Sequence, residues 1–344
     1  MISILMPCHN CECWVEETLR SVYAQTYTDW ELIAADDGST DGTPDLLRRH
    51  AAANAGVRVL TWPGDCNRGV AETRNLLLDH ACGEYVVFLD SDDLLPPYAL
   101  EVMLASLLSE DADIVEGDVR EFRSPDKAGK YMDRPAGVFR SRRLDGRRSA
   151  GLSLYQNGIC ASLWGKLYRR RIFDGIRFPA GEIYEDLSVF YRIAERARVY
   201  LRIKAVVYLY RLRDASLIHR FSPDRLVVLD VTERIEMVME ERRDAWLLAA
   251  ARDRRLAAAF NMLGHLLSDE EYGRSDSSGR ESLDPERRRG AVSVCRDIIK
   301  SYSFASVIGK DVRLKNRIGA LMALLLPRFL AEEILRRTYR RTRR

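Results

Sequence analysis

The first 120 residues alternate between short apolar runs and segments with helical periodicity. Apolar runs rich in β-forming residues predict five strands, at 2–6, 31–35, 57–62, 85–89 and 113–115. Between them, apolar residues recur at helical spacing over 13–25, 43–54, 70–82 and 97–109. Because repeated strand–helix–strand units with short connections form parallel pairs, this pattern predicts an α/β fold with a mostly parallel sheet and helices on both faces.

The pattern changes after residue 119. A basic stretch with Gly, Pro and Ser occupies 119–150, and ordered segments then resume at 152–157, 162–173, 186–197, 199–203 and 205–210. From Asp224 onward only helical periods occur, over 224–243, 244–267, 285–303 and 311–341. The polar segment 269–285 predicts a mobile linker. We therefore expect an α/β domain at 1–220 and a helical C-terminal domain at 221–344, which ends in a basic amphipathic tail.

Composition narrows the class of protein. A chain of 344 residues, 47% hydrophobic and 31% charged, is typical of a globular protein with two domains. The seven cysteines are an odd number beside apolar runs, which indicates a reducing cytoplasm and no disulfide framework. The chain begins with an apolar strand and has no run of 18 apolar residues, so we expect neither a signal peptide nor a spanning helix.

Polar residues follow the carboxyl ends of three predicted strands. They form the segments 7–10 (PCHN), 36–42 (DDGSTDG) and 90–93 (DSDD). Since parallel sheets bind ligands at the carboxyl ends of their strands, these segments mark the predicted site. Six carboxylates in two such turns are unfavourable unless a cation or hydrogen-bond donors neutralise them.

Asp90 and Asp92 lie on the same side of an extended segment, since alternate residues share a face. Two carboxylates suit Mg²⁺ or Mn²⁺, which bind few protein oxygens and complete their shell with water and phosphate. The alternative is that Asp92 and Asp93 cap the following helix. Two further alternatives stay open, namely that Asp37 forms only a turn and that His9 is an ordinary loop histidine.

Four motifs, in this order and spacing, resemble the family 2 glycosyltransferases of the GT-A fold. They are 3–10 (SILMPCHN), 35–42 (ADDGSTDG), 67–75 (NRGVAETRN) and 88–93 (FLDSDD). The resemblance covers about residues 1–220 and implies a nucleotide-sugar site and a bound Mn²⁺ or Mg²⁺ held by Asp92 and Asp90. The residues implied at the donor are Pro7, His9, Asn10, Asp37, Asn67, Gly69, Arg74, Asp90, Ser91, Arg211 and Arg213. Many members have Tyr where this chain has His9, which leaves stacking on a base intact but weakens the expectation of uridine.

Later segments resemble the acceptor side of the same family. Residues 163–170 (LWGKLYRR) resemble its W-x-K-L-Y-R segment, which implies acceptor contacts for Trp164 and Lys166. Residues 184–186 (YED) resemble its Glu-Asp motif, which implies that Asp186, with Glu185, is the catalytic base. A base is needed because a sugar hydroxyl is a poor nucleophile near neutral pH. The alternative for both acids is a helix N-terminus, and both interpretations hold together.

The C-terminal segment is strongly basic. Residues 310–344 contain eleven Lys or Arg and three Asp or Glu, around the apolar stretch 318–327. Such a segment favours contact with an anionic membrane, and the alternative is a core-packed helix with a solvated tail. Aromatic residues are not interleaved with the arginines, so we expect no nucleic-acid partner.

The resemblance implies a hexosyltransferase that inverts the anomeric centre. It would move a sugar from a nucleotide sugar, expected to be a UDP-sugar, to a glycan or polyprenyl-linked acceptor in envelope or exopolysaccharide synthesis. We expect it in the cytoplasm, peripheral to the inner face of the plasma membrane. One alternative is a sugar-phosphate nucleotidyltransferase, which needs a Gly-rich phosphate loop where 7–10 stands. The other is a non-enzymatic Mg²⁺-binding receiver or scaffold, which leaves Asp186 unexplained.

Overall fold

The computed structural model describes most of the chain and divides it into two compact units. The residues described are 1–124, 128–133, 141–213, 222–268, 284–308, 312, 314–325 and 334–335. The first unit comprises 1–149 and 162–213, and the second comprises 150–161 and 214–344. Most of the linker expected at 269–285 lies outside the described residues, as does most of the expected tail.

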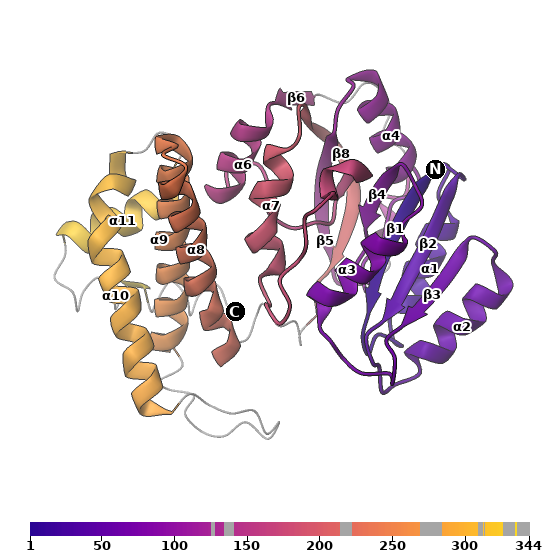
Figure 1. Ribbon diagram of the computed structural model, residues 1–344, viewed down its shortest axis with the longest axis horizontal. Coiled ribbons are helices and arrows are strands. Elements are labelled where there is room, and N and C mark those ends of the chain that lie inside the picture. Colours follow the sequence, from indigo (N-terminus) through magenta and orange to yellow (C-terminus); the bar gives the residue numbers. More distant parts are fainter. Residues whose placement is uncertain are drawn as a thin grey trace. The chain divides into compact units, whose positions relative to one another are not determined.

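The first unit is built on an eight-stranded sheet with the order β3-β2-β1-β4-β7-β5-β8-β6 (Figure 1). The strands are β1 (Ile2–Cys8), β2 (Trp30–Asp36), β3 (Val57–Thr61), β4 (Tyr85–Phe88), β5 (Ile114–Phe122), β6 (Ser141–Leu144), β7 (Lys166–Arg169) and β8 (Tyr200–Arg211). Strands β1 to β4 pair in parallel, and so do β5 and β8. The predicted mostly parallel sheet is therefore confirmed. Two strands differ from that pattern, since β7 runs antiparallel to β4 and β5, and β6 runs antiparallel to β8.

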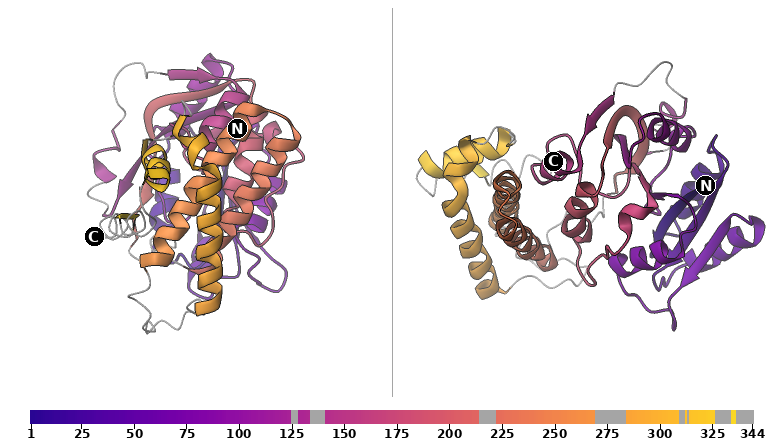
Figure 2. Two further views of the ribbon diagram at one scale, coloured as in Figure 1. Left: turned by 90° about the vertical axis from the view of Figure 1, so that its left-hand side faces the viewer. Right: turned by 45° about the horizontal axis from the view of Figure 1, so that its top comes forward.

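Helices cover both faces of this sheet, as predicted (Figures 1 and 2). They are α1 (Val15–Tyr23), α2 (Thr43–Ala53), α3 (Val70–His80), α4 (Ala99–Ser109) and α7 (Glu185–Glu195). The short 3₁₀ helix η1 (Arg170–Phe173) follows β7, and the helix α6 (Gly146–Leu154) crosses the unit boundary. On one face, α1, α2 and α4 join the even-numbered residues of β1 in one apolar core. On the other, Phe88 packs edge-on against Tyr168, Phe173 and Phe178, with ring centroids 5.7–6.2 Å apart.

The segment expected to hold two short strands, 199–203 and 205–210, is instead one strand, β8. Its pairing with β5 is interrupted, because Glu116 faces Arg202 but Asp118 faces Val206. Such a bulge inserts residues that disturb the apolar alternation without ending the strand. The irregular stretch expected at 119–150 also contains the end of β5, all of β6 and the start of α6.

The second unit is helical, which confirms the predicted class of the C-terminal region. Its helices are α8 (Val227–Glu241), α9 (Ala245–Ser268), α10 (Pro285–Ile308) and α11 (Leu314–Leu325), preceded by the turn η2 (Pro223–Leu226). Each packs on its neighbour in sequence, and α11 also contacts α9 (Figure 2). No helix within the described ranges combines the length and the apolar character needed to cross a membrane.

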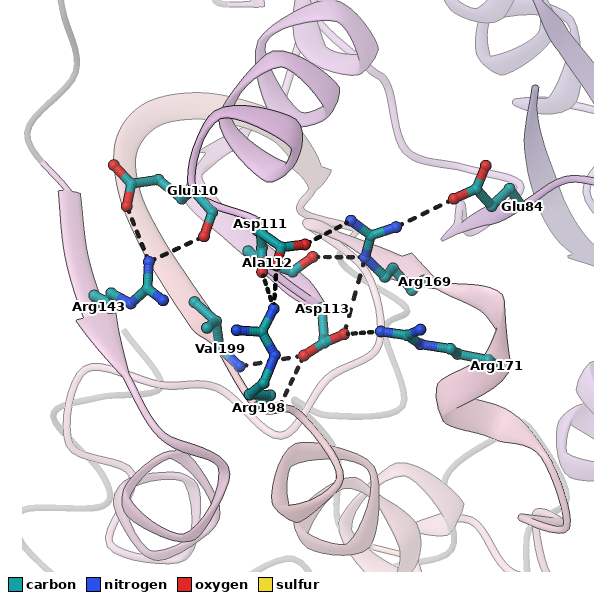
Figure 3. A network of polar contacts seen from close by, with 10 residues as sticks. All are labelled: Glu84, Glu110, Asp111, Ala112, Asp113, Arg143, Arg169, Arg171, Arg198 and Val199. Atoms are coloured by element: carbon teal, nitrogen blue, oxygen red, sulfur yellow. Dashed lines mark hydrogen bonds and ion pairs between the residues drawn. The ribbon is translucent and has the colours of Figure 1, made fainter.

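An ion-pair network closes the sheet edge where β4, β5 and β8 begin and β7 ends (Figure 3). It joins the carboxylates of Glu84, Glu110, Asp111 and Asp113 to the guanidinium groups of Arg143, Arg169, Arg171 and Arg198. The buried carboxylate of Asp113 accepts from Arg171 Nη2 at 2.8 Å and from the backbone N–H groups of Arg198 and Val199 at 2.8 and 3.2 Å. Asp113 thereby joins three separate chain segments at the edge opposite the predicted site.

Replacing Asp113 with asparagine should lower the free energy of unfolding by about 2–4 kcal/mol, since it removes one charge from a buried, hydrogen-bonded set. Burial acts to raise the pKa of Asp113, but hydrogen bonds from Arg171, Val199 and Arg198 outweigh it and lower that pKa. The stabilisation is therefore complete above the unfolded pKa of about 3.9 and is lost as pH falls through the lower folded value.

Urea unfolding is measured from pH 7 to pH 2.5 for wild type and Asp113→Asn. The difference between their free energies of unfolding should shrink below about pH 4. The matched control is Asp79→Asn, which removes an exposed pair with Arg177 and should cost less than about 1 kcal/mol. A wild-type advantage that stayed constant down to pH 2.5 would contradict the assignment.

Candidate active site

The strand register brings the predicted site residues to one edge of the sheet. Cys8 at the end of β1 pairs with Asp36 at the end of β2, and β4 ends beside β1 at the pair Leu5–Phe88. The loops that follow are tied together, since the Asn10 N–H donates to Ser39 Oγ at 2.9 Å. In the same way the Thr40 N–H donates to Asn10 Oδ1 at 2.8 Å. Pro7 is half-buried just before this junction.

Asp37 joins the loop after β2 to the start of α3. Its two carboxylate oxygens accept from the N–H groups of Arg68 and Gly69 at 2.8 and 2.9 Å. Gly69 has a φ of +86° at the N-cap of α3, a conformation that glycine adopts without steric cost. Because each carboxylate oxygen has two lone pairs, Asp37 keeps acceptor capacity for a base or ribose, and that role stays a prediction.

A close approach of two loops requires glycine at position 38. Its φ is +68°, and an added Cβ would lie 2.6 Å from the Asn67 backbone nitrogen and 2.8 Å from the Asp65 carbonyl oxygen. No side chain fits in this space. The D-D-G motif is therefore needed for packing as well as for the polar groups that it supplies.

His9 is exposed at the mouth of this edge and held by three polar groups. Its Nδ1 lies 3.0 Å from the Asp37 carbonyl oxygen, which assigns the ring proton to Nδ1. Nε2 then accepts from the side-chain amide of Asn10 at 3.2 Å, and the Asn67 amide nitrogen lies 3.2 Å from Nδ1 and 3.4 Å from Nε2. The contacts orient the ring and leave it accessible, as stacking on a nucleobase requires.

Arg74 connects two regions that are far apart in sequence. Its guanidinium lies 3.3 Å from Asp90 Oδ1 at the end of β4 and forms a buried ion pair with Glu185 at the start of α7. Burial acts to lower the pKa of Arg74, but Glu185, Asp90 and Asp186 outweigh it and raise that pKa. Arg74 therefore stays charged between the carboxylates. Its expected contact with a diphosphate stays a prediction, because the described contacts are to protein groups.

Glu185 and Asp186 occupy the first turn of α7, where the helix dipole favours negative charge. The Leu187 N–H donates to Asp186 Oδ1 at 2.6 Å. Burial raises the pKa of Glu185 to about 7, although Arg74 acts in the opposite direction. Through Arg74, the predicted base motif is joined to the predicted metal-binding carboxylate Asp90.

Asp92 faces an arginine, Arg213, that follows the end of β8. Its Oδ2 lies 2.8 Å from Arg213 Nε. Burial raises the pKa of Asp92, Arg213 lowers it, and the charge of Asp90 raises it further. Burial makes the ionised form of a carboxylate less favourable, and a nearby cation stabilises it. Here the Arg213 guanidinium is that cation.

Arg211 is buried among protein groups. Its Nε donates to the Asp92 carbonyl oxygen at 2.7 Å and its Nη2 to Glu17 at 2.5 Å. The guanidinium carbon lies 4.8 Å from the centroid of the Trp14 ring and 4.5 Å from that of Phe122. Contact with a diphosphate would require these interactions to break. Between the two arginines expected at the phosphates, the geometry thus favours Arg213.

Asp93 and Tyr208 support the D-x-D turn and were not among the expected site residues. The buried Asp93 carboxylate accepts from the Tyr208 hydroxyl at 2.8 Å and from the Arg211 N–H at 2.7 Å. Tyr208 also accepts from the Asp90 N–H at 3.1 Å. The capping alternative for Asp92 and Asp93 is wrong, since α4 begins at Ala99 with no side-chain cap. Asp93 was visible as a third acid after the pair, whereas nothing in the sequence marked Tyr208.

The two expected acceptor-side residues differ in accessibility. Trp164 is half-buried and stacks on Tyr208 and Tyr210, with centroids 5.1 and 5.6 Å apart. Lys166 is 1% exposed and donates to the Ser162 carbonyl oxygen at 2.7 Å, with Glu116 3.4 Å away. Its contacts indicate that it holds the 162–165 loop, and a direct acceptor contact stays a prediction for both residues.

Asp90 and Asp92 fit a hard divalent cation. Both are oxygen donors that already face positive groups, and Ser91 between them is buried. Within the described part of the chain, no group of three His, Cys, Asp or Glu side chains could hold a metal. Mg²⁺ and Mn²⁺ do not need such a group, because one or two carboxylates suffice when phosphate oxygens and water complete the shell.

Arg213 and a divalent cation would compete for Asp92. Replacing Arg213 with alanine should tighten binding of Mn²⁺ alone about three- to tenfold, since it removes a pair worth about 1 kcal/mol. Titration of free Mn²⁺ by electron paramagnetic resonance, without nucleotide, measures this change. The control is Arg177→Ala, whose partner Asp79 is exposed on α3. Weaker Mn²⁺ binding in Arg213→Ala would contradict competition.

A comparison with known protein families finds one family model that matches the part of the chain carrying these motifs. The family model described as glycosyl transferase family 2 matches residues 3–177. Glycosyltransferase GlyA of Streptococcus pneumoniae is 26% identical over 221 residues, which are 63% of this chain but only 31% of that protein. An Escherichia coli relative, UDP-Glc:alpha-D-GlcNAc-diphosphoundecaprenol beta-1,3-glucosyltransferase WfgD, is 30% identical over 132 residues, or 38% of this chain and 51% of that one.

A solved structure has the same fold over almost the whole chain. S. aureus TarS 1-349, in complex with UDP-GlcNAc, superposes with a TM-score of 0.63 and 19% identity. The match covers 99% of this chain and 92% of that one. At this identity the likeness concerns the fold, which is the GT-A fold expected from the motifs.

Proposed function

This chain belongs to glycosyl transferase family 2, and on that premise we propose that it transfers a sugar from a UDP-sugar to a hydroxyl of a glycan or polyprenyl-linked acceptor. The observation that carries the proposal is the Arg74 bridge, which joins Asp90 at the end of β4 to Glu185 beside Asp186. This contact supports the proposal because it connects the carboxylate proposed to bind the donor with the helix start that carries the proposed base. UDP-GlcNAc in TarS and the diphosphoundecaprenol acceptor named for WfgD support the choice of substrate class.

On the donor side, the chain's own residues bind and orient the nucleotide. His9 would stack on the base and Asp37 would accept from the base or ribose, since both are held at the mouth of the site. Asp92 and Asp90 would hold Mn²⁺ or Mg²⁺, which offsets negative charge on the departing diphosphate when bound. Arg213 would then be free to contact the phosphate oxygens.

On the acceptor side, Asp186 would take the proton of the attacking hydroxyl. At the start of α7 the helix dipole favours a negative charge on this carboxylate, which also accepts from the Leu187 N–H. A hydroxyl oxygen attacks the anomeric carbon, the bond to the diphosphate oxygen breaks, and the proton moves to Asp186. One displacement of this kind inverts the anomeric centre.

The proposal also covers the domain organisation of the chain and its location in the cell. Residues 1–220 would be the catalytic domain, and 221–344 a helical C-terminal domain. A polyprenyl-linked acceptor implies work in the cytoplasm at the inner face of the plasma membrane, in synthesis of an envelope polysaccharide.

Donor hydrolysis tests the proposal without a known acceptor. The protein is incubated with a panel of nucleotide sugars and with Mn²⁺, Mg²⁺ or EDTA, and release of the nucleoside diphosphate is measured. We expect slow release of UDP that requires a divalent cation. Pyrophosphate production from UTP and a sugar 1-phosphate, with no UDP release from any donor, would instead indicate the nucleotidyltransferase alternative.

A further inference from the structure

Helix α11 carries a line of exposed apolar side chains. Leu314, Ile318, Leu321 and Leu325 are 72%, 49%, 44% and 70% exposed. Their spacing of four, three and four residues places them on one side of the helix, and we call this set the α11 stripe. Four large apolar residues in one line are a contiguous patch, unlike single exposed hydrophobic residues, which need no explanation.

The opposite side of α11 already has its partners within the second unit. Asn316 is buried, and its Nδ2 donates to Asp253 Oδ2 of α9 at 3.1 Å. A Cβ added at Gly319 would lie 3.2–3.5 Å from the Phe260 ring, so the helix backbone packs closely there. Since these contacts orient α11, the stripe is its outward face and not a core face that awaits burial.

The charge of the sequence that contains the stripe selects the partner. Residues 310–317 contain four basic residues and only one acid, and 310–344 have a surplus of eight positive charges. An apolar line with basic flanks matches an anionic bilayer, which offers acyl chains beneath phosphate groups. A second copy of the chain would bring the same positive charge and would be repelled.

The length of α11 defines how it would lie. Its twelve residues span about 18 Å, which is too short for a hydrocarbon core of about 30 Å. We propose that the α11 stripe docks in the plane of an anionic lipid surface. The docking itself does not depend on the proposed function. Its benefit to catalysis does, because a polyprenyl-linked acceptor would lie in the same lipid surface.

Co-sedimentation of the full chain with vesicles tests the docking. The probes are phosphatidylcholine vesicles with and without 30% phosphatidylglycerol, at about 50 and 500 mM salt. We expect binding to anionic vesicles that is at least tenfold stronger than to neutral ones and that weakens in high salt. Leu321→Glu and Ile318→Glu should each weaken it about tenfold or more, since a carboxylate replaces a side chain that enters the lipid.

The matched control is Leu108→Glu, which makes the same change at a leucine that is 55% exposed on α4 of the first unit. It should bind vesicles as wild type does. Equal binding by Leu321→Glu and wild type would overturn the proposal. So would a wild-type dimer that Leu321→Glu converts to a monomer without change in vesicle binding, because the stripe would then be a self-contact.

Donor hydrolysis without vesicles separates this proposal from the proposed function. The stripe variants should hydrolyse the donor at the wild-type rate, because α11 belongs to the second unit and the donor residues to the first. Absence of hydrolysis in wild type would count against the transferase and leave the vesicle result intact. Loss of vesicle binding with normal hydrolysis in the stripe variants is the expected outcome.

Discussion

Replacing Asp92 with alanine should abolish cation-dependent binding of the donor, with a loss of about 100-fold or more in affinity for UDP in the presence of Mn²⁺. Asp92 is the D-x-D carboxylate that faces Arg213, just beyond the end of β8, so it is available to a cation once that side chain moves to the phosphates. Calorimetric titration of UDP with Mn²⁺ and with EDTA measures the change. The difference between the two titrations, large in wild type, should vanish in the variant.

Two further variants separate a metal role from a structural one. Asp92→Asn keeps the size of the side chain and should lose the Mn²⁺ dependence as Asp92→Ala does. Asp79→Ala removes an arginine-paired aspartate on α3 and should bind UDP with Mn²⁺ as wild type does. Unchanged Mn²⁺-dependent affinity in Asp92→Ala would make the central assignment wrong.

Replacing Asp186 with asparagine should spare donor binding and reduce sugar transfer by about 10²–10⁴-fold. Asparagine keeps an oxygen that accepts from the Leu187 N–H, so the start of α7 should be preserved. It does not take a proton from a hydroxyl near neutral pH. The measurement pairs UDP affinity, expected within about twofold of wild type, with transfer to an acceptor extract.

Glu182→Gln is the control for Asp186→Asn, because Glu182 accepts from Ser188 at 2.6 Å near the same helix start. It should transfer sugar within a fewfold of wild type. If Asp186→Asn instead weakened donor binding and left the transfer rate at saturating donor unchanged, Asp186 would belong to the donor site and another group would be the base.

Local patterns in the sequence were sufficient for much of the fold. Parallel strands buried on both faces form continuous apolar runs, and β1, β2 and β4 were found for this reason. Because ligands bind where such strands end, the pattern also located 7–10, 36–42 and 90–93 at one edge. The family resemblance drawn from those motifs is confirmed by the match over residues 3–177.

Elements that depend on partners far away in the sequence were harder to predict from the sequence. The direction of β7 and the continuity of β8 depend on pairing with strands far away in the sequence, and a bulge hides the period of β8. The family resemblance implied that Arg211 contacts the donor, but the Trp14 and Phe122 rings hold its guanidinium. The residue type shows which interactions a side chain can make, but it does not show which group in the folded protein it contacts.

The sequence by itself determined the order of strands and helices over the first 120 residues, the edge where the candidate site lies and the D-x-D carboxylates, because each is encoded within a few neighbouring residues. Only the tertiary structure decided which side chains pair around that edge. Arg74 contacts Glu185 across 111 residues, and Tyr208 contacts Asp93 across 115. Such pairs follow from chain packing, in which burial makes an unpaired charge or hydroxyl costly, and no periodicity along the chain records them.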